Sequence, residues 1–351
     1  MKYKKTMIII IPIIIILLVI FGWIVALKIT VSSFKPTEGS LPMIINSEES
    51  IKQGQLITIM TWNLGYGGLG EESNFIADGG KSILPPSKAI VAKNITNITT
   101  FIQQNPVNIF LLQEVSKRSR LTYNLDLWQM LINALPNYNR VHSPTVKIPW
   151  FPIIGRLITG NAVISNLQPV EAIRCNLPLE DKGLLGVFKQ RYNFIVSRYD
   201  LPETEKQLVV ADLHLAAFDE GGLVRKKQLS KLQSFMLEEY KKGNYVVVGG
   251  DWNHRLIKTD FPTTTEEKFL FWIHNLPEDF TPNGWQWALD ENVPTVRTLE
   301  HSYIINENYT CIIDGFLLSP NLELLSVQGF NQQFRYSDHN PIKIEIKPTG
   351  I

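Results

Sequence analysis

The chain has 351 residues, 44% of them hydrophobic, and a formal net charge of +1. This length and composition are enough to bury a large core, in one large α/β domain or in two smaller ones. Residues 1–30 contain four lysines and no acid, so the remainder has 30 basic and 33 acidic residues, a net charge of −3. That balance excludes a polybasic nucleic-acid-binding surface, although not a nuclease whose bound metal supplies positive charge.

The N-terminus contains an uncharged apolar run, Met7–Leu27, of 21 residues. A helix of this length spans a bilayer, and Pro12 near its start is tolerated in a membrane helix. The basic residues within 1–6 predict a cytoplasmic tail and place the rest of the chain on the extracytoplasmic side. We therefore predict a single-pass membrane anchor over 7–27, with a cleaved signal peptide as the alternative interpretation.

Residues 28–54 are polar and lack sustained periodicity, which predicts a linker that holds the following domain away from the membrane. Residues 55–348 contain no internal repeat or long low-complexity stretch and are predicted to form one domain. The chain has two cysteines, Cys175 and Cys311. The sequence is compatible with a disulfide between them and with two free buried thiols.

Within this domain, apolar runs typical of strands alternate with segments of helical periodicity. The predicted strands are Gln55–Thr61, Val107–Val115, Gly160–Asn166, Arg191–Tyr199, Gln207–Leu215, Tyr245–Val248, Cys311–Leu318 and Ser337–Ile346. The predicted helices cover Ser87–Gln104 and approximately Tyr123–Leu135 and Arg225–Lys241. This alternation favours a layered α/β or α+β sandwich.

One stretch, Thr145–Thr159, is apolar and broken by prolines, and it fits neither a periodic helix nor a good strand. Two interpretations remain open for it. It forms either a buried loop or an exposed apolar lid that touches a membrane or an apolar substrate.

The decapeptide YVVVGGDWNH, residues 245–254, begins as a buried strand and turns at two glycines. Asp251, Asn253 and His254 follow the turn. A carboxylate and a carboxamide are hard oxygen groups that suit Mg²⁺ or a phosphate-bound water. A simple Asx turn at the strand end is the structural alternative.

The same arrangement, a strand that leads to a polar side chain, recurs along the chain. The residues concerned are Asn63, Glu114, His214, Asp251 with Asn253, Asp314, and Asp338 with His339. A glutamate at the end of a buried strand is costly unless it is paired or binds a metal. Six such positions predict a site at one rim of packed sheets.

Seven segments carry a resemblance to a known family. In chain order they are TWNLGYGG, LLQEV, GNAVISN, ADLHLAAFDEGGLVRKKQL, VVVGGDWNH, IDGFLLS and SDHNP. As an ordered set over about Ile57–Ile346, they resemble the endonuclease/exonuclease/phosphatase superfamily, which includes deoxyribonuclease I and neutral sphingomyelinases. The resemblance implies a four-layer sandwich of two packed mixed β-sheets flanked by helices. It also implies one Mg²⁺-dependent site that cleaves phosphoesters, with Mn²⁺ as an alternative ion.

The resemblance assigns the metal side of this site to three residues. Glu114 matches the principal metal ligand, and Asn63 and Asp338 match the residues beside it. Their oxygen atoms suit Mg²⁺, which takes oxygen ligands and can polarise a phosphoryl oxygen.

The catalytic residues implied by the resemblance are His339, oriented by Asp314, and Asp251, which orients or activates water. Asn253 matches a phosphate contact, and His214 matches a second histidine that contacts the phosphate or the leaving group. An Asp–His pair fixes one tautomer and provides a base or an imidazolium near neutral pH.

Two further residues are implied as phosphate contacts, Arg191 and Asn161. The tyrosine that some nucleases place before GNAVIS has no match here, since Thr159 and Gly160 precede Asn161. This departure argues against a DNA-specific geometry. His254 has no role in the family pattern.

Together these observations predict a membrane-anchored phosphoesterase whose catalytic domain faces outward. The net acidity of the exported part, the apolar 148–158 loop and the segment HLAAFDEGG favour a phospholipid or a small phosphoester as substrate. An extracellular nuclease acting on DNA or RNA is the alternative. A non-catalytic binding module that retains the fold is the alternative of another class, and no protein partner is inferred.

Overall fold

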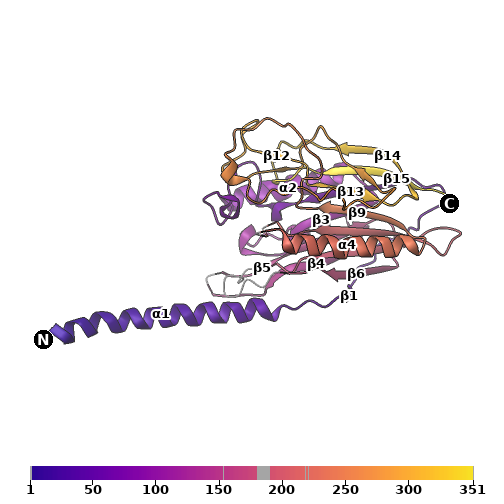
Figure 1. Cartoon of the computed structure of the whole chain (residues 1–351). Coiled ribbons are helices and arrows are strands. Elements are labelled where there is room, and N and C mark those ends of the chain that lie inside the picture. The colour runs from indigo at the N-terminus through magenta and orange to yellow at the C-terminus, as the bar shows by residue number, and fades with distance from the viewer. Residues whose placement is uncertain (1, 153, 180–189, 218, 220, 351) are drawn as a thin grey trace.

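The computed structural model describes residues 2–350 apart from residues 153, 180–189, 218 and 220. Two residues of the segment HLAAFDEGG therefore lie outside the described residues. The α-helices are α1 (Lys2–Ser33), α2 (Lys88–Gln104), α3 (Leu127–Ala134) and α4 (Leu223–Lys241). Short 3-10 helices occupy the loops: η1 (Gly65–Gly67), η2 (Ile76–Asp78), η3 (Arg120–Thr122) and η5 (Glu267–Phe269). Figure 1 shows α1 projecting from the globular part that contains the other elements.

Two β-sheets form the centre of this globular part. The first has the order β14 (Leu322–Gly329), β15 (Ile342–Pro348), β2 (Ile57–Asn63), β3 (Ile109–Ser116), β5 (Leu157–Ser165), β4 (Asn139–Ile148). The second has the order β1 (Gly39–Ser40), β6 (Glu171–Asn176), β7 (Asn193–Asp200), β8 (Gln207–His214), β9 (Tyr245–Asp251), β13 (Asp314–Leu318), β10 (Gln286–Ala288). A separate short pair joins β11 (Val296–Arg297) to β12 (Thr310–Cys311).

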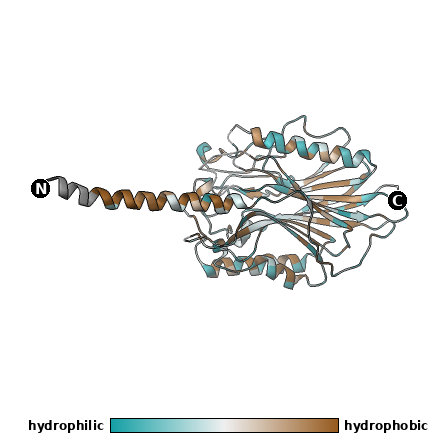
Figure 2. Cartoon of the chain, turned by 90° about the horizontal axis from the view of Figure 1, so that it is seen from below, coloured by the Kyte–Doolittle hydropathy of each residue, from teal (hydrophilic) through white to brown (hydrophobic). Residues whose placement is uncertain are grey.

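Both sheets are mixed. β2 and β3 run parallel, as do β8 and β9, while neighbouring strands elsewhere in the two sheets run antiparallel. Helices cover the outer faces of the two sheets (Figure 2). The predicted sandwich of two packed mixed sheets flanked by helices is therefore confirmed.

The central strands are buried on both faces. Along β2, Ile57 and Ile59 pack in the core between the sheets, whereas Met60 and Trp62 pack in the core that contains α2 and α3. Alternate side chains of a strand point to opposite faces, so two covered faces require apolar residues at nearly every position. This is why these strands appear in the sequence as continuous apolar runs.

Some predicted boundaries differ from the structure. The helix predicted from Tyr123 begins at Leu127, because the Asp126 side chain accepts a hydrogen bond from the Gln129 N–H at 3.0 Å and caps the helix there. Asp314, predicted inside a strand, is the first residue of β13. Cys175 and Cys311 are both free thiols.

The segment 28–54 is not the extended linker that its polar composition predicted. Helix α1 continues through Ser33, and Gly39–Ser40 pairs with β6. Ile51 is buried in the core between the sheets, and Ile44 forms a bridge with Arg140. A few apolar residues spaced through a polar segment are enough to hold it along the surface of the domain.

Helix α1 contains a stretch, Ile10–Ser33, that is long and apolar enough to cross a membrane. It overlaps the predicted span Met7–Leu27 and ends six residues later. The side chains of Ile13 and Leu18 in this stretch are exposed and contact no apolar core. Figure 2 shows this apolar part of α1 outside the globular part. An anchor and a signal sequence both fit these facts.

A buried polar contact joins the two sheets. Gln113 of β3 donates from Nε2 to Asp212 Oδ1 of β8 at 2.6 Å, and the other Asp212 oxygen has no partner among the described residues. Burial raises the pKa of Asp212 well above its usual value, and the Gln113 hydrogen bond only partly opposes this shift. Burial therefore favours the protonated form of Asp212 in the folded protein.

We predict that Asp212→Asn reduces the loss of stability between pH 5 and pH 8. The folded state holds a proton on Asp212 that the unfolded state releases, so this contribution to stability falls as pH rises. One such proton accounts for about 1.4 kcal/mol of unfolding free energy per pH unit. Urea unfolding at several pH values measures how the free energy of unfolding changes with pH. An unchanged slope in the variant would show that Asp212 is ionised in the folded protein.

Candidate active site

The site lies where strands of both sheets end. In the second sheet, His214 at the end of β8 pairs with Asp251 at the end of β9, and Asp251 pairs with Asp314 at the start of β13. In the first sheet, Asn63 is the last residue of β2. His339 lies in the loop that precedes β15. The packing of the sheets brings these five residues to one edge.

Strand β9 does not turn at the two glycines, where the sequence predicted a turn, but continues through them to Asp251, and its close pairing with β8 depends on the second glycine. Gly250 has φ +141°, and a Cβ atom there would lie 2.1 Å from the Leu213 carbonyl oxygen. A side chain at this position would push β9 away from β8. The Asp251 side chain then accepts a hydrogen bond from the Asn253 N–H at 2.9 Å, and Asn253 Nδ2 donates to the Leu215 carbonyl at 2.8 Å. The Asx turn is thus present, and it also fixes both side chains in the site.

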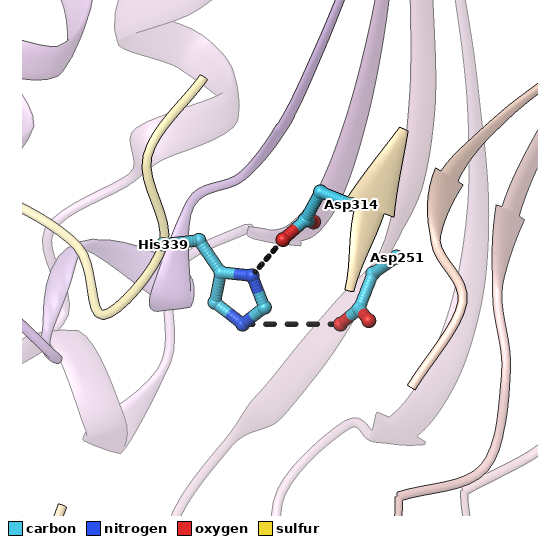
Figure 3. A group of neighbouring side chains, drawn as sticks. All are labelled: Asp251, Asp314 and His339. Atoms are coloured by element: carbon cyan, nitrogen blue, oxygen red, sulfur yellow. Dashed lines mark hydrogen bonds and ion pairs between the residues drawn. The ribbon is translucent and has the colours of Figure 1, made fainter. Parts of the chain in front are cut away.

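The Asp251 carboxylate lies at the centre of the polar groups. Its Oδ2 accepts a hydrogen bond from Asn63 Nδ2 at 3.0 Å and lies 3.5 Å from His214 Nε2 and 3.9 Å from His339 Nε2. His339 Nδ1 lies 2.8 Å from Asp314 Oδ2 (Figure 3). Because an ionised carboxylate only accepts hydrogen bonds, Nδ1 carries a proton and Nε2 faces Asp251.

The two histidines differ in charge. Burial alone would lower the pKa of His339, but Asp314, its hydrogen bond, and the Asp251 and Asp338 carboxylates raise it to about 10. Burial lowers the pKa of His214 to about 3, and the charge of His339 adds to this effect. At neutral pH the site therefore contains one imidazolium and one neutral imidazole.

Glu114 enters the site through an irregularity in β3. The pairing of β3 with β5 shifts register between Leu112 and Val115, and Glu114 has the left-handed φ of 53°. A bulge of this kind redirects a side chain that regular pleating would place elsewhere. Positive φ is uncommon for a residue other than glycine, which marks a backbone conformation that the surrounding fold must hold.

Glu114, Asp338 and Asn63 all line the cleft. Burial raises the pKa of Glu114 to about 8, and the nearby Asp338 carboxylate is the next cause. The position of Asp338 requires Gly65, since a Cβ there would lie 2.7 Å from Asp338 Oδ1. Two close carboxylates and an amide oxygen, poorly compensated by protein cations, fit a hard divalent ion such as Mg²⁺ or Mn²⁺.

A second group of potential metal ligands is Asp251, Asp314 and His339, whose ligand atoms lie within 4.8 Å of one another. In this group, however, the His339 Nδ1 proton is already shared with Asp314 and Nε2 faces Asp251 (Figure 3). These hydrogen-bonding geometries suit an acid–base pair better than a metal centre.

The site opens into a cleft of about 750 Å³. Its polar floor contains seven of the predicted residues: Asn63, Glu114, His214, Asp251, Asn253, Asp338 and His339. Asp314 lies behind His339 and does not line the cleft. The walls are largely apolar and include Leu69, Phe75, Ala77, Leu121, Val146, Ile154, Leu157, Trp272, Val296, Leu299 and Ile313.

Two predicted phosphate contacts do not line this cleft. Asn161 is fully buried in β5, and its Nδ2 donates to the Asn193 carbonyl oxygen at 3.1 Å. Arg191 lies at the chain segment that enters β7, with its N–H bonded to the Thr145 carbonyl oxygen. His254 is also buried away from the cleft, with Nδ1 2.7 Å from the Trp252 carbonyl oxygen.

Three cleft residues were not predicted. Tyr66 has φ 44° in the glycine-rich loop LGYGGLG, residues 64–70, and its buried hydroxyl has no hydrogen-bond partner among the described residues. Burial, then the Glu114 and Asp338 carboxylates, raise its pKa, so the hydroxyl remains a donor. Asp78 lies in η2, where burial and Asp338 raise its pKa to about 7. The glycine-rich loop was the only sequence signal near either residue.

The third cleft residue that was not predicted is Arg297 of β11, a buried cation on the Asp338 side of the cleft. Its guanidinium donates to the carbonyl oxygens of Gly70 and Thr298 at 2.7 and 3.0 Å. Burial lowers its pKa to about 10, and Asp338 and Glu300 oppose the shift, so it stays charged. Arg297 comes from a loop-rich region without periodicity, and no sequence signal marked it.

Residues 60–339 match the model of the Endonuclease/Exonuclease/phosphatase family. The chain belongs to this family. It is accordingly a hydrolase of phosphoester bonds by family membership. No curated protein sequence matches the chain.

Solved structures of family members share the fold. An endonuclease/exonuclease/phosphatase from Beutenbergia cavernae aligns with 16% identity and a TM-score of 0.55, over 84% of this chain and 72% of that chain. TDP2 of D. rerio, complexed with a single-strand DNA product, aligns with 13% identity and a TM-score of 0.52, over 84% of this chain and 99% of that chain. The human Nocturnin catalytic domain, with a bound sulfate anion, aligns with 19% identity and a TM-score of 0.50, over 88% of this chain and 98% of that chain. At these identities the likeness is one of fold.

We predict that divalent metal binding strengthens as pH rises from 6 to 8. In the ion-free protein a proton on Glu114 competes with the metal, and its pKa of about 8 means that this competition is lost only near pH 8. The Mg²⁺ concentration that half-maximally raises the melting temperature should fall on the order of tenfold or more over this range. Thermal denaturation at graded Mg²⁺ measures it. Glu114→Gln should bind weakly with little pH dependence, and an unchanged response in this variant would remove Glu114 from the metal site.

Proposed function

We propose that the protein is a membrane-anchored, Mg²⁺-dependent phosphoesterase whose catalytic domain lies on the extracytoplasmic side. The proposed substrate is a phospholipid or another phosphoester with an apolar part. The observation that carries this proposal is the composition of the cleft, in which acid–base and metal-type groups form the floor and apolar side chains form the walls. A substrate with a phosphoester head and an apolar portion complements both.

Glu114, Asp338 and Asn63 would hold the ion, with Mn²⁺ as an alternative to Mg²⁺. When bound, the ion polarises a phosphoryl oxygen and stabilises the leaving oxygen. The remaining polar side chains of the site have roles that do not require contact with the ion. The Asp251 carboxylate is fixed by Asn63 and the Asn253 N–H, so it can orient a water and accept its proton. Burial raises the pKa of Asp251 to about 7, which suits a proton acceptor near neutral pH.

His339 has a different role in this mechanism. Asp314 keeps its Nδ1 protonated and its ring oriented, so the imidazolium presents Nε2–H to the cleft. A fixed cation there stabilises the negative charge that develops on the phosphoryl oxygens during attack. Asn253 and the neutral His214 line the same floor and would contact the phosphate or the leaving oxygen. Arg191 and Asn161 take no part, because neither side chain lines the cleft.

The variants His339→Ala and Asp314→Asn test the acid–base pair. We expect His339→Ala to reduce kcat for a soluble phosphodiester by about 10²- to 10⁴-fold, the range for a general acid–base group, when the assay is run well below the melting temperature of the variant. Asp314→Asn should give a smaller loss, because the imidazole remains but its charge is less favoured. His301→Ala is the matched control, since that histidine is exposed and does not line the cleft. Equal activity of His339→Ala and the control would remove His339 from the mechanism.

The apolar walls predict a dependence on the length of the substrate's alkyl chain. Each methylene group buried against the walls contributes about 0.8 kcal/mol, so kcat/KM should rise about fourfold per methylene until the walls are covered. A series of soluble phosphodiesters with increasing alkyl chains, assayed with Mg²⁺, measures this. Leu299→Asn should flatten the series without changing the shortest member.

The same assay panel should include DNA, RNA, a sphingomyelin and inositol phosphates. Cleavage of nucleic acid alone, with no response to alkyl length, would contradict the lipid assignment and support an extracellular nuclease. Absence of hydrolysis with both Mg²⁺ and Mn²⁺, together with ligand binding that survives Glu114→Ala, would instead support a non-catalytic binding module.

A further inference from the structure

The C-terminal part of α1 packs against the wall of the cleft. Leu27 and Val31 are buried with Val146 and Ile148 of β4 and with Phe151, and Trp23, Ile154 and Leu157 pack against this group. Val146, Ile154 and Leu157 also line the cleft. The segment Thr145–Thr159, for which the sequence left a buried loop and an exposed lid open, contains the end of β4 and the start of β5, and it is partly buried against α1.

The cleft opens at the end of the domain from which α1 projects. In Figure 1 the C-terminus, which follows β15, lies at the end away from the free part of α1. β2 runs antiparallel to β15, so Asn63 at the end of β2 lies at the α1 end. If α1 enters a bilayer, the mouth of the cleft faces that bilayer.

The length of α1 fixes the depth of this contact. A helix rises 1.5 Å per residue, and about 20 residues are needed to cross the hydrocarbon layer. Counted from Met7, such a span includes Trp23 and ends just before Lys28. The Trp23 ring lies 5.2 Å from the Phe151 ring in an edge-to-face contact. Phe151 must then lie at the depth of Trp23, close to the outer boundary of the membrane.

The residues around Phe151 have the chemistry of such a boundary. Trp150 is 68% exposed, which is large for a tryptophan in a folded domain. Lys147 and Arg156 are exposed on either side of it. Tryptophan and basic side chains concentrate at the level of lipid headgroups, where an apolar ring and a polar edge are both satisfied.

The chain segment that contains these residues is predominantly basic. From Lys117 to Gly160 the chain has six basic residues and one acidic residue, Asp126. Burial lowers the pKa of Lys117 and, although Asp126 opposes this, Arg156 and Lys147 lower it further, so the three basic groups lie near one another. This contrasts with the net charge of −3 beyond residue 30, and it complements an anionic lipid surface.

We infer that the surface formed by Lys147, Trp150 and Arg156, beside the buried Phe151, is a membrane-docking surface that lies in the headgroup layer of the bilayer entered by α1, with anionic phospholipid as its partner. It holds the cleft mouth against the lipid surface, so that a lipid phosphoester reaches the floor without leaving the bilayer. This inference rests on the proposed anchoring by α1, and it deepens the proposed function by naming the bilayer that presents the substrate.

The test measures the depth of residue 150 in the full-length chain. An environment-sensitive fluorophore is attached at Trp150→Cys or, as the matched control, at Leu325→Cys, an exposed position in β14 near the opposite end. Both variants are made with Cys175→Ala and Cys311→Ala and reconstituted in phosphatidylcholine vesicles containing phosphatidylglycerol. We expect spin-labelled lipid to quench most of the emission of the fluorophore at position 150, and iodide in the water to leave that emission unchanged. At position 325 we expect iodide to quench the emission and spin-labelled lipid to leave it unchanged.

Two other results would overturn the inference. Co-flotation with the vesicles but iodide quenching at 150 would show an anchored protein whose loop stays in water. Absence of co-flotation would refute the anchor as well. Hydrolysis of a soluble phosphodiester, measured on the same samples, reports the proposed chemistry independently of both.

The charge complementarity has its own test. Lys147→Gln combined with Arg156→Gln should reduce lipid quenching at 150 in vesicles with phosphatidylglycerol to the level seen in phosphatidylcholine alone. Equal quenching with and without the two charges would overturn the assignment of anionic lipid as the partner.

Discussion

The packing of the two sheets is the constraint on which the site depends, because the decisive polar contacts cross from one sheet to the other. Asn63 of β2 donates to Asp251 of β9 across this interface, and His339, before β15, lies within 2.8 Å of Asp314 of β13. Neither pair is close in sequence. The apolar core between the sheets, which includes Ile59, Leu111 and Val247, therefore positions the acid–base groups to within a hydrogen-bond length.

This arrangement also explains the unusual protonation states. Water is excluded from the sheet interface, so carboxylates that meet there attract protons, and the His339 imidazolium is the compensating charge on the catalytic side. On the other side, Asp78 and Asp338 lie near Arg297, whose guanidinium donates to carbonyl oxygens, and Glu114 lies near Asp338 and Asp78. The excess negative charge is therefore concentrated where a divalent ion would be expected.

Much of this site could be predicted from the sequence, because each strand ends where its apolar run gives way to a polar residue. Asn63, His214 and Asp251 follow that rule, Asp338 and His339 stand where another strand was predicted to begin, and the ordered family motifs implied the role of each. The bulge that presents Glu114 could not be predicted, since it follows from a register shift between β3 and β5. Arg297, Tyr66 and Asp78 lie in loops without periodicity, and only the folded chain brings them to the cleft. The packing of residues 28–54 and of α1 also depends on contacts distant in sequence.

The central claim is that Glu114, Asp338 and Asn63 hold a divalent ion beside an Asp314–His339 acid–base pair. The most direct measurement is a crystal structure of the full-length protein with Mn²⁺ and a phosphate analogue, using the anomalous signal to place the ion. The account predicts a peak coordinated by Glu114 and Asp338, with the analogue between the ion and His339. A peak bound by Asp251, Asp314 and His339, or no ordered metal at concentrations that support hydrolysis, would contradict it.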